Sequence, residues 1–160
     1  MIVVLMGVTG SGKTTVGKLL SRALNWKYYD ADDFHPSANV EKMRGGIPLQ
    51  DADRKTWLET LRDLIRDCLD RGENAVLACS ALKEDYRRLL LIDESVKLIY
   101  LEGDYELIQK RLSRRRRHYM NPGLLDSQFE TLEPPKDSIE VNVSSSPSQI
   151  ARTIRRRLDL

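Results

Sequence analysis

Residues 7–14 read GVTGSGKT and fit the pattern G-x-x-x-x-G-K-[ST] at every fixed position. The apolar, β-branched run at residues 2–6 precedes the motif, and a segment with apolar residues at helical spacing follows it. A strand before the motif and an amphipathic helix after it are the context in which this pattern forms a phosphate-binding loop, or P-loop. The stretch predicts an α/β protein that binds a nucleoside triphosphate.

The residue types of the motif suit phosphate chemistry. Glycines let backbone N–H groups turn toward phosphate oxygens, and a helix that begins near the last glycine adds its positive dipole end. The lysine would reach the β- and γ-phosphates, and the following threonine hydroxyl would coordinate Mg²⁺. A glycine-rich turn with an incidental lysine is the weaker interpretation. The predicted nucleotide-binding residues here are Gly7, Val8, Thr9, Gly10, Ser11, Gly12, Lys13, Thr14 and Thr15.

Outward from the motif, short apolar runs alternate with longer segments of helical period. This alternation predicts a parallel sheet covered by helices, within a single domain over residues 1–160. Ser146 and Pro147 resemble an N-cap and first helical residue, which predicts a last helix after them. The five expected strands are residues 2–6, 26–30, 74–78, 97–101 and 139–143.

Composition excludes several classes of protein. The chain has 160 residues, 41% of them hydrophobic, and 26 Lys+Arg against 24 Asp+Glu give a net charge of +2, which offers little support for bulk polyanion binding. No apolar run approaches the roughly 18 to 20 residues of a membrane span. Cys68 and Cys79 have no metal-site spacing and lie in apolar contexts. We therefore expect a soluble cytoplasmic protein with buried thiols, not associated with membranes or nucleic acid.

Within the P-loop proteins, the chain lacks an N-K-x-D guanine signature with a D-x-x-G switch, and it is short for a large ATPase. A small kinase acting on a metabolite remains. Two segments, residues 30–53 and 113–135, fit the alternation badly and predict irregular binding loops. We expect a mobile substrate segment at about residues 33–53 and a lid at about residues 113–125.

Three aspartates, Asp30, Asp32 and Asp33, lie at the carboxyl end of the second expected strand. The carboxyl ends of parallel strands meet at one edge of a sheet, so these side chains should face the P-loop. A solvated turn is the alternative for any one of them. The sequence therefore predicts an acceptor and Mg²⁺ site at this edge, to which a second acidic group at residues 51–53 would contribute.

At these and further blocks the chain resembles the gluconokinases of the small P-loop, thermoresistant type. The resemblance implies a three-layer P-loop kinase fold, similar to nucleoside monophosphate kinases, with a five-stranded parallel sheet and an arginine-rich lid. The chain departs from the pattern at Arg117, where relatives usually have glycine before the pair seen here as His118 and Tyr119. The blocks run over residues 6–14, 30–36, 41–43, 46–49, 51–54 with 57–58, 79–83 with 86–87, and 127–134.

The same resemblance implies transfer of the γ-phosphate of ATP to the terminal hydroxyl of D-gluconate, giving 6-phosphogluconate, and a homodimer. Lys13 would hold the donor, Asp32 would take the hydroxyl proton, and Asp30 would hold Mg²⁺ with Thr14. Asp33 could exchange roles with Asp32.

Gluconate carries a carboxylate and several hydroxyls, so its pocket needs a guanidinium and polar partners. Arg54 is the leading carboxylate ligand, and an ordinary surface ion pair is its alternative. Lys83 and Arg87, four residues apart, should share one helical face. The weaker candidates for substrate binding are His35, Ser80, Lys83, Arg87 and Gln128.

An arginine run occupies residues 111–117. In isolation it indicates a solvated basic face or nucleic-acid binding. In a small kinase it closes over the triphosphate and stabilises transition-state charge. By resemblance to nucleotide kinases, Arg111 would stack on adenine and Arg115 would reach the phosphates, while Pro147 would flank the adenine.

Two alternatives remain. A shikimate-type or adenylylsulfate-type kinase would share the same core. An ATP-responsive nucleic-acid-binding protein would use the arginine run, but the near-neutral charge argues against it.

Overall fold

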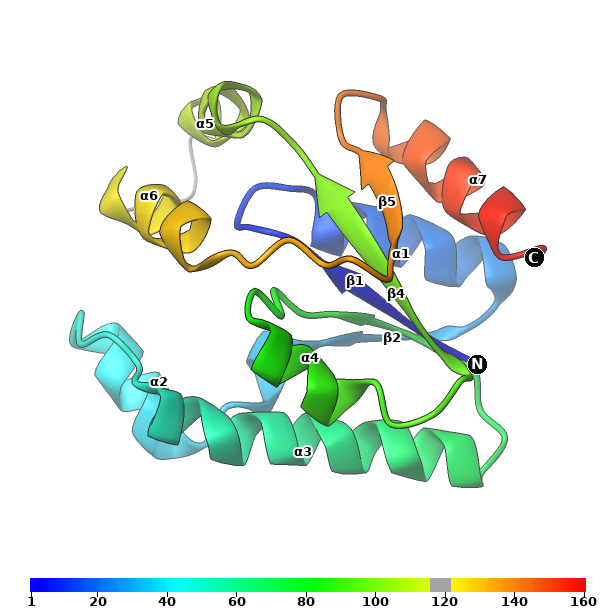
Figure 1. The fold of residues 1–160 in the computed structure, drawn as a ribbon, viewed down its shortest axis with the longest axis horizontal. Coiled ribbons are helices and arrows are strands. Elements are labelled where there is room, and N and C mark those ends of the chain that lie inside the picture. Colours follow the sequence, from blue (N-terminus) through cyan, green and yellow to red (C-terminus); the bar gives the residue numbers. More distant parts are fainter. Residues whose placement is uncertain (116–121) are drawn as a thin grey trace.

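The computed structural model describes residues 1–115 and 122–160. Its centre is a sheet of five parallel strands in the order β2-β3-β1-β4-β5, so the two edges are the four-residue strands β2 and β5 (Figure 1). The central strand β1 is buried along its whole length, as expected for a strand covered on both faces. The bounds are β1 (Ile2–Met6), β2 (Lys27–Asp30), β3 (Ala75–Ala78), β4 (Val96–Glu102) and β5 (Ile139–Asn142).

Helices cover both faces of this sheet, which gives the three layers seen in Figure 1. Helices α3 and α4 pack on one face, α1 and α7 pack on the other, and α5 and α6 lie beyond the carboxyl end of β4. The bounds are α1 (Lys13–Leu24), the 3-10 helix η1 (Ala31–Phe34), α2 (Ser37–Arg44), α3 (Asp51–Asp70), α4 (Glu84–Leu90), α5 (Tyr105–Ser113), α6 (Pro122–Thr131) and α7 (Pro147–Arg157).

Alternation along β1 explains the two cores. Val4 and Met6 point to the α3 face, where they meet Leu61, whereas Val3 and Leu5 point to the α1 face. Both cores consist mainly of aliphatic side chains, joined on the α3 face by Trp57 and Tyr100, and they exclude water almost completely. The sheet is therefore fixed from both sides, and the strand ends that form the site rest on a rigid base.

The five expected strands are confirmed, each within one residue of its expected bounds. The expected three-layer α/β architecture is confirmed as well. The expectation of irregular chain at residues 30–53 is wrong, because η1, α2 and the first turn of α3 lie there. Likewise α6 lies within residues 113–135. The helices η1, α2 and α6 are short and only weakly amphipathic, so they lack the long apolar stripe by which the sequence reveals a helix.

None of the helices formed by the described residues combines the length and apolar character that a membrane crossing requires. Cys68 and Cys79 are free and buried, as expected.

Candidate active site

The P-loop wraps the beginning of α1 at the carboxyl end of β1. Gly12 precedes the helix with a φ of 97°, a left-handed conformation that side-chain-bearing residues rarely adopt. Gly10 also has a positive φ, 77°, and a Cβ atom there would lie 2.7 Å from the Leu112 side chain of α5. The loop therefore keeps its shape only with glycine at these positions, and α5 packs directly against it.

The Lys13 side chain returns across the loop. Its Nζ donates to the Gly7 carbonyl at 2.8 Å and to the Val8 carbonyl at 3.0 Å. Burial lowers the pKa of Lys13 to about 8, partly offset by the nearby Asp32 and Asp30 carboxylates. The ammonium group is thus charged at neutral pH but held by neutral carbonyls, and phosphate oxygens would be stronger partners.

Opposite the loop, the end of β2 presents two carboxylates. The Asp30 carboxylate accepts from the Asp32 backbone N–H at 3.0 Å, which turns the chain into η1. The buried Trp57 of α3 donates its Nε1–H to the Ala31 carbonyl at 2.7 Å and ties this turn to the core. Local turn chemistry and one long-range hydrogen bond therefore fix where Asp32 lies.

Asp32 faces the pocket with an open side chain that an acceptor could reach. Partial burial of its carboxyl group, then the charge of Asp30, raises its pKa and makes it a better proton acceptor. His35 stacks on Trp57 with ring centroids 4.3 Å apart, and its Nε2 lies 3.9 Å from Asp32 Oδ1. Burial lowers the pKa of His35, so its ring is neutral at neutral pH.

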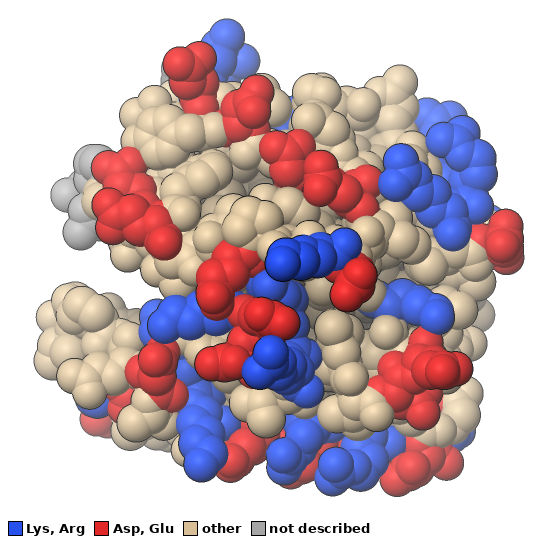
Figure 2. Space-filling model, viewed as in Figure 1, with Lys and Arg blue, Asp and Glu red and all other residues tan. Residues whose placement is uncertain are grey.

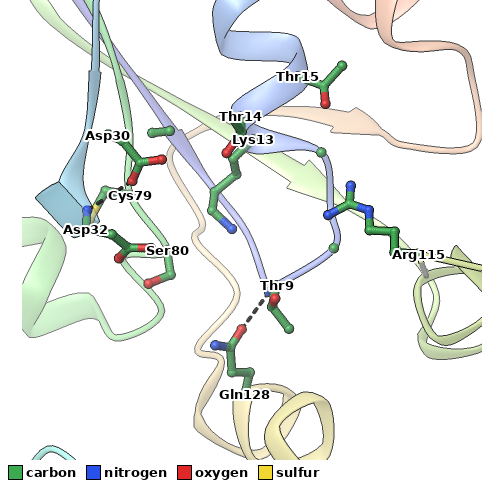
Figure 3. Close-up of a pocket in the computed structure, with 13 residues that line it drawn as sticks. Thr9, Lys13, Thr14, Thr15, Asp30, Asp32, Cys79, Ser80, Arg115 and Gln128 are labelled. Atoms are coloured by element: carbon green, nitrogen blue, oxygen red, sulfur yellow. Dashed lines mark hydrogen bonds between the residues drawn. The ribbon is translucent and has the colours of Figure 1, made fainter. Parts of the chain in front are cut away.

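The P-loop, Asp30 and Asp32 line one cavity of about 210 Å³. Figure 3 shows Asp30, Asp32 and Ser80 on one side of Lys13 and Arg115 on the other. Gln128 of α6 accepts from the Thr9 backbone N–H at 2.6 Å, so α6 contacts the P-loop directly. The lining residues are Thr9, Gly10, Gly12, Lys13, Thr14, Thr15, Asp30, Asp32, Ala78, Cys79, Ser80, Arg115 and Gln128.

The cavity could hold Mg²⁺ only with help from phosphate. Thr14 and Asp30 supply the oxygen ligands that Mg²⁺ prefers. Within residues 1–115 and 122–160, no group of three or more His, Cys, Asp or Glu side chains could hold a metal ion by itself. One or two protein oxygens combined with substrate phosphates is the usual arrangement for this ion, so the donor set fits it.

A second polar group joins the start of α3 to α4. The Asp51 carboxylate accepts from the Tyr86 hydroxyl at 2.6 Å and from Lys83 Nζ at 3.3 Å. Arg54 Nη1 lies 3.9 Å from the same carboxylate and 3.5 Å from the Tyr86 hydroxyl oxygen. Sequence reasoning selected Arg54 and Lys83 and expected Asp51 in an acidic group at the acceptor site, but it did not foresee that Asp51 pairs with these two cations.

The structure places other candidates apart. Arg87 is buried and donates to the Ala81 and Leu82 carbonyls, so it supports that loop and does not share a face with Lys83, contrary to expectation. Asp53 completes the capping box of α3 and pairs with Lys42 at 2.9 Å, so it is not part of the acidic pocket expected at residues 51–53.

Several other predicted site residues do not line the cavity or lie outside the described residues. Asp33 is exposed and does not line the cavity. Arg111 lies on α5 and Pro147 begins α7, both outside the cavity lining. Arg117 and its neighbours His118 and Tyr119 lie outside the described residues, as does the middle of the expected lid.

Comparison with known proteins agrees with this geometry. A probable gluconokinase of Mus musculus is 42% identical over 178 residues, covering 98% of this chain and 97% of the relative. The thermoresistant gluconokinase of Escherichia coli (strain K12) is 42% identical over 144 residues, covering 89% and 82%. The crystal structure of a gluconokinase from Sinorhizobium meliloti 1021 superposes with a TM-score of 0.85 at 34% identity, covering 98% and 91%. The chain belongs to the gluconokinase family.

A family model described as shikimate kinase also matches, over residues 9–158. Solved shikimate and adenylylsulfate kinases are 22% identical or less to this gluconokinase-family chain, so their likeness shows the fold alone. That fold, a P-loop kinase with a five-stranded parallel sheet, is the one expected from the sequence.

The low pKa of Lys13 predicts how nucleotide affinity depends on pH in this gluconokinase-family chain. Below a pH of about 8 the ammonium is already charged, and above it ATP must bind together with a proton. We expect ATP affinity, measured by calorimetry, to fall by up to about tenfold for each pH unit above this value. Lys13→Met should weaken binding and remove this dependence. An affinity unchanged between pH 7 and 9 would contradict the assignment.

Proposed function

We propose that the chain transfers the γ-phosphate of ATP to the terminal hydroxyl of D-gluconate and forms 6-phosphogluconate. The observation that carries the proposal is the position of Asp32, which shares a cavity with the P-loop lysine and lies 3.9 Å from His35 Nε2. The names of relatives that match this chain over nearly its full length support the same acceptor.

In the proposed reaction the acceptor oxygen forms a bond to the γ-phosphorus while the bond from that phosphorus to the bridging oxygen of ADP breaks. The hydroxyl proton passes to Asp32, whose raised pKa suits it to accept a proton. Lys13 and Arg115, on the P-loop side of the cavity, would stabilise charge on the transferred group. Catalysis then consists mainly of positioning and charge neutralisation.

Thr14 and Asp30 would hold Mg²⁺, which neutralises phosphate charge when it is bound. Arg54 would bind the gluconate carboxylate with Lys83. Ser80 and Gln128 line the cavity, and His35 lies next to Asp32, so these three would contact the acceptor hydroxyls. Arg87, held by two carbonyls, contributes only by shaping the loop before α4.

Several wider features belong to the same proposal. The chain would work as a single domain, with a moving substrate segment at about residues 33–53 and a lid at about 113–125. By resemblance to nucleotide kinases, Arg111 of α5 would stack on the adenine. A cytoplasmic location suits two free thiols. A homodimer is proposed from family resemblance.

On the face in Figure 2 acidic and basic side chains are interspersed, so that face offers nucleic acid no continuous basic surface.

A panel of acceptors tests the function. ADP release should be seen with D-gluconate, and rates with shikimate and with adenylylsulfate should stay at background. The shikimate kinase family model makes shikimate the informative competitor, since it too carries a carboxylate. Turnover of shikimate without turnover of gluconate would overturn the proposal.

Replacing the proposed base should remove turnover without unfolding the protein. Asp32→Asn keeps the shape of the side chain but cannot accept the proton, so we expect kcat to fall about 10²- to 10⁴-fold. Asp63→Asn, on the exposed side of α3, is the matched control. Near-normal kcat in a folded Asp32→Asn protein would exclude Asp32, and a larger loss in Asp33→Asn would exchange the two roles.

Removing the proposed carboxylate ligand should act on substrate binding. Arg54→Ala loses a charge-assisted contact worth about 1.5–3 kcal/mol, so KM for gluconate should rise about ten- to hundredfold while KM for ATP changes little. Arg66→Ala, an exposed arginine on the same helix, controls for loss of charge. Steady-state kinetics that leave the gluconate KM unchanged would remove Arg54 from the site.

A further inference from the structure

The group around Asp51 has the chemistry of a carboxylate receptor. A hydroxyl, an ammonium and a guanidinium converge on one carboxylate, with the distances given above for Tyr86, Lys83 and Arg54. Tyr86 and Lys83 belong to the start of α4, 32 or more positions along the chain from Asp51, so these contacts are not local helix chemistry. Arginine, lysine and hydroxyl donors together are what a bound organic acid requires.

The Asp51 side chain is not part of the N-terminal cap of α3. The cap of α3 is formed by the reciprocal hydrogen bonds of Gln50 and Asp53. A negative charge in the first turn is favourable in water without any partner. The Asp51 side chain is 69% exposed and therefore already largely hydrated. Its ion pairs stabilise it only slightly, and moving it fully into solvent would cost little free energy. Its contacts with α4 are therefore replaceable.

The receptor lies close to the site of transfer. The His35 ring is within electrostatic reach of both groups, because Asp32 raises its pKa and Arg54 lowers it. The His35 ring also stacks on Trp57, which stands one helical turn after Arg54 on α3, so Arg54 belongs to the helix face that packs near His35. An acceptor with its reacting hydroxyl at Asp32 would extend past His35 and bring its far end to Arg54, Lys83 and Tyr86.

We propose that Asp51 is an internal stand-in for the carboxylate of the acceptor, occupying Arg54, Lys83 and Tyr86 in the free protein until an anionic acceptor displaces it. This inference rests on the proposed function and deepens it. Asp51 keeps three donors paired and correctly placed when no acceptor is bound. It also acts as a selectivity residue, since an acceptor without a negative charge cannot replace the carboxylate it removes.

Calorimetric titration of D-gluconate without nucleotide tests the exchange. In Asp51→Asn the internal competitor has lost its charge, so gluconate should bind about three- to tenfold more tightly. KM should fall in parallel, because Asp51 competes with the acceptor for the same three donors. Asp51→Glu, which restores a carboxylate, should return the affinity toward the original value. Asp63→Asn and the melting temperature of each variant control for general effects of charge and folding.

D-Glucitol, a polyol of the same length without a carboxylate, provides the second readout. Its affinity should be the same in the original protein and in Asp51→Asn. Gluconate binding that is unchanged or weaker in a folded Asp51→Asn protein would overturn the inference, as would equal gains for both ligands. Gluconate turnover by the unmodified protein, measured in parallel, reports on the proposed function alone.

Discussion

The placement of one ammonium group organises this molecule. Lys13 begins α1, and its Nζ bridges the Gly7 and Val8 carbonyls of its own loop. The loop can close around it only because Gly10 and Gly12 take positive φ angles and α5 packs over the first of them. The carboxylates at the end of β2 face this cation and support its charge. The order of the strands, the shape of the P-loop and the carboxylates at the end of β2 together position the Lys13 ammonium group.

Although the net charge of the chain is close to zero, its acidic and basic side chains gather in different places around Lys13. Two aspartates face the cavity from the end of β2, and Arg115 faces it from the end of α5. Other charges of the same blocks have structural uses, as Asp53 and Lys42 show by pairing across α2 and α3. A cluster of like charges in a sequence therefore divides, in the structure, between chemistry and support.

The sequence alone predicted the strands and the P-loop because both depend on local patterns, buried runs and obligatory glycines. The same reasoning placed Asp30 and Asp32 correctly at the sheet edge, since parallel strands end together. Arg87 shows the limit of sequence-based prediction. Its position in the helix does not reveal that its guanidinium donates hydrogen bonds to two carbonyls of the preceding loop. The pairing of Asp51 was not foreseen because its partners Lys83 and Tyr86 lie 32 and 35 positions away, at another helix.

The two edge strands have a consequence for how copies of the chain could meet. Strands β2 and β5 carry the open hydrogen-bonding edges of the sheet, yet each offers only four residues, with charged Lys27 on one and Glu140 on the other. Lys27 is 56% exposed at its side chain and pairs with Glu73, which precedes β3. Short, charged edges discourage strand addition and runaway aggregation. Self-association of this fold should therefore use helix surfaces and leave the sheet at five strands.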